Sequence, residues 1–121
     1  MSKTPYEVPL EPKFNIQYSD HHERERKERL HNIRKLVGFG KPIKAFYWDK
    51  DHINGKEEHI ITDNGLIIIF NVRTQKLVTI LIARPNQISR YWTLQGLDVP
   101  SQYNYLLELA KDHEEKGYNY L

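Results

Sequence analysis

The sequence predicts an α+β domain in which an N-terminal helix packs on a four-stranded antiparallel β-meander and a C-terminal helix follows. Two observations lead to this fold class. A charged segment with helical spacing gives way, after a Gly/Pro break at 38–42, to four short runs rich in β-branched and aromatic residues. The loops between these runs are shorter than the crossovers that parallel strands need, so the strands should be antiparallel. A helix laid on such a sheet gives the predicted architecture.

The composition is that of one folded domain. The chain has 121 residues, of which 39% are hydrophobic and 28% charged, which is enough for a single core. A net charge of +2 is compatible with a nucleic-acid partner but does not require one. The absence of cysteine excludes disulfides, thiolate metal sites and cysteine nucleophiles. No apolar run approaches the roughly 20 residues that span a bilayer, and no signal peptide is evident. We therefore expect a cytoplasmic protein without membrane contact.

The first part of the chain is expected to form an arm and then a helix. Residues 1–18 contain three prolines and no periodicity, which predicts an extended N-terminal arm before a single α+β domain at 19–121. Ser19 or Asp20 is a suitable N-cap for a helix that continues to about Val37. The glycines and the proline of the sequence GFGKP then end this helix.

The remainder is expected to form strands joined by turns and then a helix. Asn64-Gly65 is the strongest hairpin signal, and the apolar run at 66–72 predicts a central strand covered on both faces. Residues 98–117 predict the last helix, whereas 84–92 are expected to contain a short helical turn. The four predicted strands are 43–49, 57–63, 66–72 and 77–83.

The charged helix is predicted to have two different sides. Each helical residue advances about 100°, which places Leu30, Ile33, Leu36 and Val37 on one arc toward the sheet. Toward the N-terminus the same arc carries His22, Arg26 and Arg29, and a helix rotated by one residue would exchange His22 for His21. Arginine forks match phosphate geometry, and histidine transfers protons near neutral pH. The alternative is that these arginines extend over the sheet rim into solvent or pair with glutamates along the helix.

A second candidate region covers the fourth predicted strand and its exit. Strict alternation places Leu77, Thr79 and Leu81 on one face of the strand and Val78, Ile80 and Ile82 on the other. The exit interleaves basic and polar residues with aromatic ones, a pattern that suits single-stranded RNA. The alternative is a loop whose aromatic rings pack in the core while its arginines stay in solvent. The residues in question are Arg84, Asn86, Gln87, Arg90, Tyr91 and Trp92.

The histidines of the sequence do not predict a metal site. His21 and His22 would point about 100° apart on a helix and chelate poorly together. His59 and the nearby Arg73 could reach one sheet face, although alternation leaves that face open, and His52 and His113 are expected at the surface. We expect neither a metal nor another cofactor.

Three segments carry a resemblance to a known group of proteins: DHHERERKER on the first helix, the break GFG, and the strand LVTILIARP. Over residues 19–92 the chain resembles the barnase-like small ribonucleases, the group that links barnase, EndoU, the RNA-cleaving colicins and RelE-type toxins. It is most similar to the phage- and prophage-encoded members of Gram-positive bacteria. The resemblance implies a metal-independent endoribonuclease in which a ribose 2′-hydroxyl attacks the phosphate.

The resemblance also implies roles for individual residues. His22 or His21 would be the general base or acid, and Arg26 and Arg29 would hold the scissile phosphate. Thr79 would contact that phosphate or orient a neighbour. Charge on the phosphorane would be stabilised by Arg84 or Arg73. With the polar and aromatic residues already noted at the exit of the fourth strand, the candidate substrate-binding set is Arg73, Arg84, Asn86, Arg90 and Tyr91. No glutamate base is evident on the predicted sheet.

Two other functions fit the same sequence. A non-catalytic phage or mobile-element accessory protein would bind a host protein or nucleic acid through residues 84–92 and the aromatic arm. A dimeric structural module would cover the apolar 66–72 strand with a second subunit. The partners to consider are therefore RNA, a host protein or an antitoxin, and the chain would act as a monomer or homodimer.

Overall fold

The computed structural model describes residues 4–11, 17–18, 23–51 and 55–120. Two short strands, β1 (Tyr6–Val8) and β2 (Gln17–Tyr18), precede helix α1 (Glu23–Leu36). The main sheet strands are β3 (Pro42–Asp51), β4 (Gly55–Thr62), β5 (Leu66–Asn71) and β6 (Lys76–Ile82). The chain continues through α2 (Pro85–Thr93), the 3-10 turn η1 (Ser101–Tyr103), α3 (Asn104–Glu115) and the 3-10 turn η2 (Tyr118–Tyr120).

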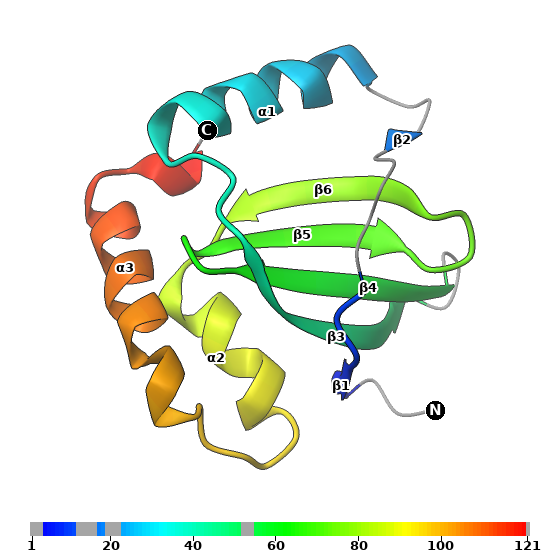
Figure 1. Cartoon of the computed structure of the whole chain (residues 1–121), viewed down its shortest axis with the longest axis vertical. Helices are drawn as coiled ribbons and strands as arrows, with labels where there is room; N and C mark the ends of the chain where they lie inside the picture. The colour runs from blue at the N-terminus through cyan, green and yellow to red at the C-terminus, as the bar shows by residue number, and fades with distance from the viewer. Residues whose placement is uncertain (1–3, 12–16, 19–22, 52–54, 121) are drawn as a thin grey trace.

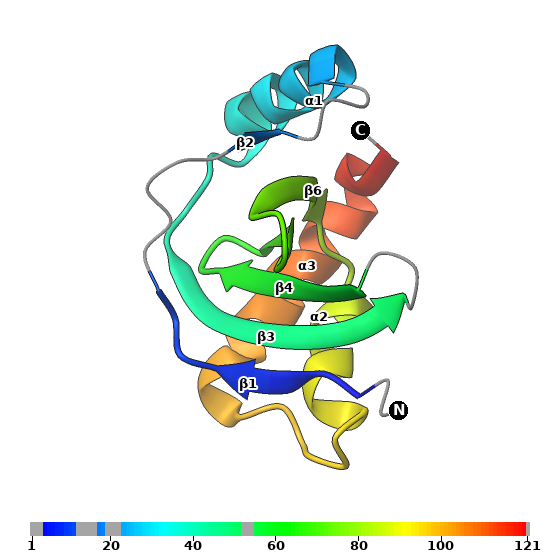
Figure 2. The same ribbon diagram turned by 90° about the vertical axis from the view of Figure 1, so that its right-hand side faces the viewer.

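The strands form one sheet in the order β1-β3-β4-β5-β6-β2 (Figure 1). Strands β3 to β6 form the predicted antiparallel meander, and β1 adds antiparallel to β3. The two-residue β2 pairs parallel with β6, and Figure 2 shows β1 and α1 at opposite edges of the sheet. The α+β class with an antiparallel sheet is confirmed. The prediction of four strands is wrong, because segments of the arm pair with the backbone groups of both sheet edges.

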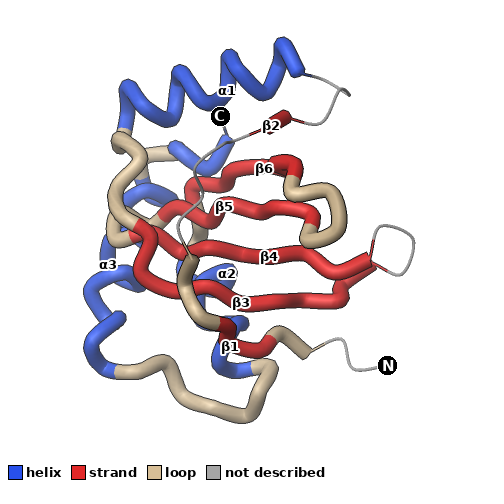
Figure 3. The backbone as a smooth tube through the Cα atoms, turned by 45° about the vertical axis from the view of Figure 1, so that its right-hand side comes forward, coloured by secondary structure: helices blue, strands red, loops and turns tan. Residues whose placement is uncertain are grey.

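The sheet separates two hydrophobic cores. Helices α2 and α3 cover one face, which we call the α2/α3 face, and α1 packs beside β6 toward the other, the α1 face (Figures 1 and 3). The predicted central strand β5 contributes Ile67 and Ile69 to the α2/α3 face and Leu66 and Phe70 to the α1 face. Its expected cover on both faces is therefore confirmed.

From residue 27 onward, where its side chains are described, the first helix follows its predicted sidedness with one exception. Leu30, Ile33 and Val37 belong to the core of the α1 face. Leu36, expected on the same arc, is 42% exposed. It lies about 60° beyond Ile33, away from Leu30, so the sheet covers only the middle of the predicted arc.

Residues 84–92 form a full helix rather than the expected short turn. Pro85 occupies the first helical position, where its missing N–H is not needed. Gln87 caps the start by accepting a hydrogen bond from the Arg84 backbone N–H at 2.8 Å. Ile88, Tyr91 and Trp92 then fall at the i, i+3, i+4 spacing and are buried together.

The alternation predicted for β6 is wrong at its start. The pairing register passes from Ile69 with Thr79 to Phe70 with Leu77, which marks a β-bulge. The extra residue places Leu77 in the core of the α1 face, while Val78 packs against the α2/α3 core. One inserted residue is enough to exchange the two faces of the strand.

The turn between β4 and β5 holds the loop that follows α1. Asn64 donates from Nδ2 to the Val37 carbonyl at 3.0 Å and to the Gly38 carbonyl at 2.7 Å. Asp63 accepts the Lys41 backbone N–H at 2.8 Å. We call these contacts the turn clamp. It fixes the end of α1 to the sheet across 26 and 27 positions of the sequence.

His113 is buried, and its predicted surface position is wrong. Only 5% of the residue is exposed, and its ring lies 5.7 Å from that of Tyr118. Among the described residues its Nδ1 finds no hydrogen-bond partner. Burial lowers the pKa of His113, with the neighbours Asp112 and Lys116 acting in opposite directions.

This histidine gives a pH-dependent prediction. As the pH falls, the unfolded chain protonates the imidazole near its ordinary pKa of about 6.5, while the folded protein resists protonation. Stability conferred by neutral His113 is therefore present above that pH and lost as the pH falls below it. Urea unfolding at pH 7.5 and at pH 5.5 measures how much free energy of unfolding is lost between the two pH values. This loss should be smaller for His113→Gln than for wild type. The same substitution at the exposed His31 should leave the loss unchanged, and an equal change in both variants would contradict the assignment.

Candidate functional site

The predicted His/Arg face of α1 is described only in part. His21 and His22 lie outside the described residues, and Arg26 is placed by its backbone alone. Arg29 does lie beside Thr79, since both line a hollow of about 10 Å³ between α1 and β6. The Arg29 Nε donates to the Ile80 carbonyl at 3.0 Å, on the outer part of the sheet. The hollow has room for about one water molecule, so it holds no phosphate group.

The predicted substrate-binding residues do not form a single cluster. Arg73 and Asn86 are exposed on a turn and on α2. Arg84, at the start of α2, lies 3.7 Å from a Glu114 carboxylate oxygen, and its guanidinium carbon is 5.3 Å from the Tyr120 ring centroid. Arg90 and Tyr91 lie near the other end of α2, against β3 and β4. The expected cluster therefore contracts to these last two residues.

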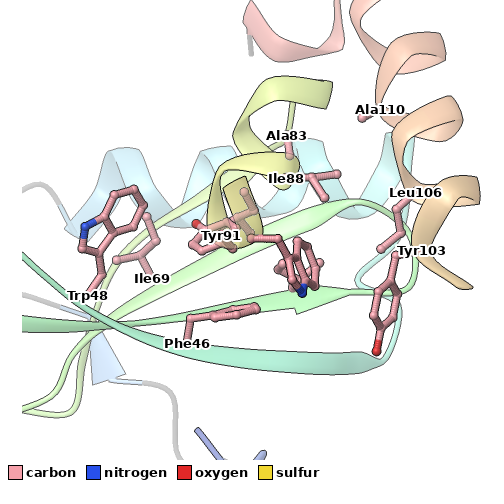
Figure 4. Close-up of a cluster of buried hydrophobic side chains, with 12 residues drawn as sticks. Phe46, Trp48, Ile69, Ala83, Ile88, Tyr91, Tyr103, Leu106 and Ala110 are labelled. Atoms are coloured by element: carbon pink, nitrogen blue, oxygen red, sulfur yellow. The ribbon is translucent and has the colours of Figure 1, made fainter. Parts of the chain in front are cut away.

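The packing alternative holds for the aromatic residues of this segment. Tyr91 is fully buried and Trp92 is 5% exposed. Trp92 stacks on Tyr103 with ring centroids 5.4 Å apart and meets Phe46 edge-on at 5.3 Å. These rings belong to the α2/α3 core drawn in Figure 4.

A buried chain of polar groups begins at Tyr91. The His59 side chain is fully buried, with Nδ1 2.7 Å from the Tyr91 hydroxyl and Nε2 3.0 Å from Glu57 Oε1. Burial raises the pKa of Tyr91 to about 12, so its hydroxyl stays protonated and donates a hydrogen bond to Nδ1. The His59 Nε2–H then donates to the Glu57 carboxylate. This arrangement fixes both the tautomer of His59 and the orientation of Glu57.

Arg90 and Trp48 lie beside the same chain of groups. The Arg90 guanidinium carbon is 4.9 Å from the Trp48 ring centroid and 5.6 Å from that of Tyr91. Trp48 pairs with Glu57 across the β3–β4 ladder, and its indole is 5.4 Å from the His59 ring. Figure 4 shows Trp48 and Tyr91 in the cluster between the sheet and α2. We call Trp48, Glu57, His59, Arg90 and Tyr91 the Glu57 site.

The Glu57 site combines opposite charges at the edge of a dry core. The Glu57 side chain is 16% exposed, and Arg90 is half-buried, so both reach the surface above His59. Their charges act on the Tyr91 hydroxyl in opposite senses, because Arg90 lowers its pKa and Glu57 raises it. A carboxylate can take a proton and a guanidinium can bind a phosphate. Both kinds of group are therefore present at this site.

Sequence reasoning missed two members of this site and left a third open. Glu57 and Trp48 are absent from the candidates based on the sequence, and His59 is given there only as a residue that could reach a sheet face. Residues two apart on a strand share a face, and Trp48 lies opposite Glu57 in the hairpin. The missing information was α2, which brings Tyr91 to His59 across 32 positions of the sequence. With α2 assigned, the i, i+3, i+4 pattern would have directed Tyr91 toward the sheet.

Comparisons of the chain with protein-family models, with curated proteins and with solved structures give no match. The similarity to barnase-like ribonucleases therefore stays a prediction. Within the described ranges no three His, Asp or Glu side chains gather where they could hold a metal ion. The described helices also include none with the length and apolar character needed to cross a bilayer.

Proposed function

We propose that this protein is a metal-independent endoribonuclease-like protein that binds single-stranded RNA and cleaves it at the Glu57 site. The observation that supports the proposal is the Glu57 carboxylate, held by the buried His59 at 3.0 Å and accompanied by Arg90. A glutamate on the sheet is also the group that the resemblance to small ribonucleases lacked at the level of sequence.

The proposed reaction uses the ribose of the substrate as its nucleophile. Glu57 accepts the proton of the 2′-hydroxyl while the 2′-oxygen forms a bond to phosphorus. The bond from phosphorus to the 5′-oxygen breaks, and that oxygen takes a proton from solvent. The products are a 2′,3′-cyclic phosphate and a 5′-hydroxyl. Arg90 would stabilise the negative charge that develops on the phosphorane oxygens.

His59 would act as a positioning residue in this reaction. It is fully buried, so it reaches the substrate only through Glu57. Its Nε2–H fixes one carboxylate oxygen and leaves the other for the substrate. Tyr91 holds His59 in the required tautomer from the other side.

The helix α1 remains the competing location for the chemistry. The proposal based on the sequence assigns catalysis to His22, His21, Arg26, Arg29 and Thr79. Arg29 and Thr79 line one small hollow, where Arg29 Nε donates to the Ile80 carbonyl. The two locations predict different inactive variants, so one series of substitutions separates them.

The deciding experiment measures cleavage of a labelled single-stranded RNA of mixed sequence in EDTA. Wild type should cleave it and release 2′,3′-cyclic phosphates, whereas the same oligonucleotide made with 2′-deoxyribose should stay intact. Arg90→Gln should lose about 100-fold or more of the activity. Arg84→Gln, on the same helix and paired with Glu114, is the matched control and should retain activity.

The same assay includes His21→Ala, His22→Ala and Arg29→Ala. Loss of activity in these variants at unchanged thermal stability, with Arg90→Gln still active, would move the site to α1. Absence of cleavage by wild type would overturn the enzymatic part of the proposal. Binding of the uncleaved RNA, measured by fluorescence anisotropy, would then show whether the RNA-binding part survives.

A second candidate function, a non-catalytic accessory protein that binds another protein, is favoured by one observation. Leu94 and Leu97, in the loop between α2 and η1, are each 52% exposed. Exposed aliphatic residues close together in one loop are typical of protein contacts more than of RNA contacts. Replacing both by serine should weaken capture of a protein partner and leave RNA cleavage unchanged.

A further inference from the structure

An apolar pocket of about 230 Å³ opens between α1, the loop after it and the α1 face of the sheet. Its walls come from five different parts of the chain. Leu30 lies on α1, Phe39 and Pro42 follow that helix, and Thr62, Ile68 and Ile80 lie on β4, β5 and β6. The Glu57 site lies on the opposite face of the sheet. The pocket is therefore independent of the proposed RNA chemistry.

The inner surface of this pocket offers almost nothing to water. Thr62 lines the pocket, but its hydroxyl group donates to Asn64 Oδ1 and accepts the Leu66 N–H at 3.0 Å. The volume corresponds to several water molecules, each of which prefers two to four polar partners. Water in such a pocket is poorly held and is easily displaced by an apolar group. The pocket is smaller than the roughly 300–1,000 Å³ of typical drug-sized sites, which points to a small ligand.

The rim of the pocket is positively charged. Lys27 and Arg34 precede and follow Leu30 by three and four residues, so they flank it on the helix surface. The Arg34 guanidinium carbon lies 6.0 Å from the centroid of the Phe39 ring, which is 40% exposed at the pocket wall. Glu28 lies about 160° around the helix from Leu30, away from the opening.

A third cation borders the pocket from inside the fold. Arg29 lines the adjoining small hollow, which shares Leu30 and Ile80 with the larger pocket. The acidic neighbour Asp63 directs its carboxylate to the Lys41 backbone N–H. An apolar floor under a cationic rim is complementary to a ligand with an apolar body and one anionic head.

We propose that this pocket binds a small amphipathic carboxylate, with an apolar body of about eight carbon atoms. The tail would lie against Leu30, Ile68 and Ile80, and the carboxylate would face Arg34 at the rim. No covalent step is involved.

The test is calorimetric titration of the full chain with sodium octanoate, accompanied by thermal unfolding at increasing octanoate. Saturable binding of one octanoate per chain with a rising unfolding temperature is expected. Sodium acetate, which lacks the tail, should not bind, and 1-octanol, which lacks the charge, should bind more weakly. Failure of octanoate to bind would overturn the proposal, as would equal binding of octanol.

Substitutions at the rim and in the wall of the pocket locate the ligand. Arg34→Gln should weaken octanoate binding by about two- to five-fold, the effect of one exposed ion pair. Lys35→Gln, about 140° around the helix from Leu30, is the matched control and should bind as wild type does. Ile68→Phe should fill the pocket and abolish binding. If this variant fails to fold, Phe39→Ala removes an exposed wall instead and should weaken binding.

Binding that survives both pocket variants would place octanoate elsewhere and overturn the assignment. Octanoate that does not bind, combined with capture of an acidic leucine-containing peptide that Ile68→Phe abolishes, would also overturn it in favour of a protein partner. RNA cleavage should be unaffected by Ile68→Phe and Arg34→Gln. The result of this test is therefore separate from that of the ribonuclease assay.

Discussion

Glu57→Gln is expected to lower the rate of RNA cleavage by about 100- to 10,000-fold, the usual effect of losing a general base. The amide cannot accept the proton of the 2′-hydroxyl. Its carbonyl oxygen can still accept the hydrogen bond from His59 Nε2, which is 3.0 Å from Oε1 in the wild-type protein. The substitution therefore removes the proposed chemistry while it preserves the contact that supports the fold.

The measurement is the single-turnover cleavage rate at saturating protein, with urea unfolding of the same preparations. Glu108→Gln, on the exposed side of α3, is the matched control and should cleave at the wild-type rate. Glu57→Asp keeps a carboxylate but withdraws it by one methylene, so it should retain part of the activity. Full activity in Glu57→Gln would remove Glu57 from the reaction and leave α1 as the location to pursue.

The meander could be predicted because its signals are local. Each signal determines the structure of the few residues that carry it. These signals are the β-branched runs, the Asn64-Gly65 turn and the apolar 66–72 segment. The turn itself differs in detail, since Gly65 donates its N–H to the Thr62 carbonyl at 3.2 Å and has a φ of 84°. Asp63 and Asn64 therefore occupy its centre and Gly65 follows, a conformation that glycine adopts at little cost.

The features that escaped prediction depend on partners distant in sequence. Tyr6–Val8 forms a strand because β3 offers an unpaired edge, a property that the arm sequence does not carry. The β6 bulge is visible only in the register against β5, where it exchanges the faces of Leu77 and Val78. In the same way, His113 has the neighbours of an exposed helix residue in the sequence but lies against η2 in the structure.

The candidate site shows the same division between local and distant information. Arg90 and Tyr91 were proposed from the local mixture of basic and aromatic residues, and they do meet at the sheet. The sequence pattern alone could not distinguish Arg90 and Tyr91 from Arg84. Only the helical geometry of α2 shows that Arg84 lies beside Glu114. The role of Glu57 depends on His59 and Tyr91 together. The sequence shows only a carboxylate on a strand. Its candidate role becomes visible when the structure shows a buried donor that fixes one of its oxygens.

Asn64→Ala is expected to lower the free energy of unfolding by about 2–4 kcal/mol, because it removes the centre of the turn clamp. The side chain donates to two backbone carbonyls, at 3.0 Å and 2.7 Å, and accepts the hydroxyl of the buried Thr62. Alanine leaves the two carbonyls and the Thr62 hydroxyl without the hydrogen bonds that the amide provides, while the surrounding chain still shields them from water. Urea unfolding monitored by tryptophan fluorescence measures the loss, and Asn86→Ala at the exposed surface of α2 should change stability by about 0.5 kcal/mol or less.

A second substitution tests the clamp through the backbone instead of the amide. Gly40 has a φ of 65°, and a Cβ built there would collide with the side-chain oxygens of Asp63 and Asn64. Gly40→Ala should therefore be strongly destabilising, whereas Gly38→Ala, at a similar φ of 73° but with open space around it, should carry the backbone cost alone. If both variants lost the same free energy of unfolding, the loss would come from the positive φ alone, and contact with the turn clamp would contribute nothing. The loop held by the clamp supplies Phe39 and Pro42 to the apolar pocket, so Asn64→Ala should also weaken octanoate binding. RNA cleavage on the opposite face of the sheet should persist as long as this variant stays folded.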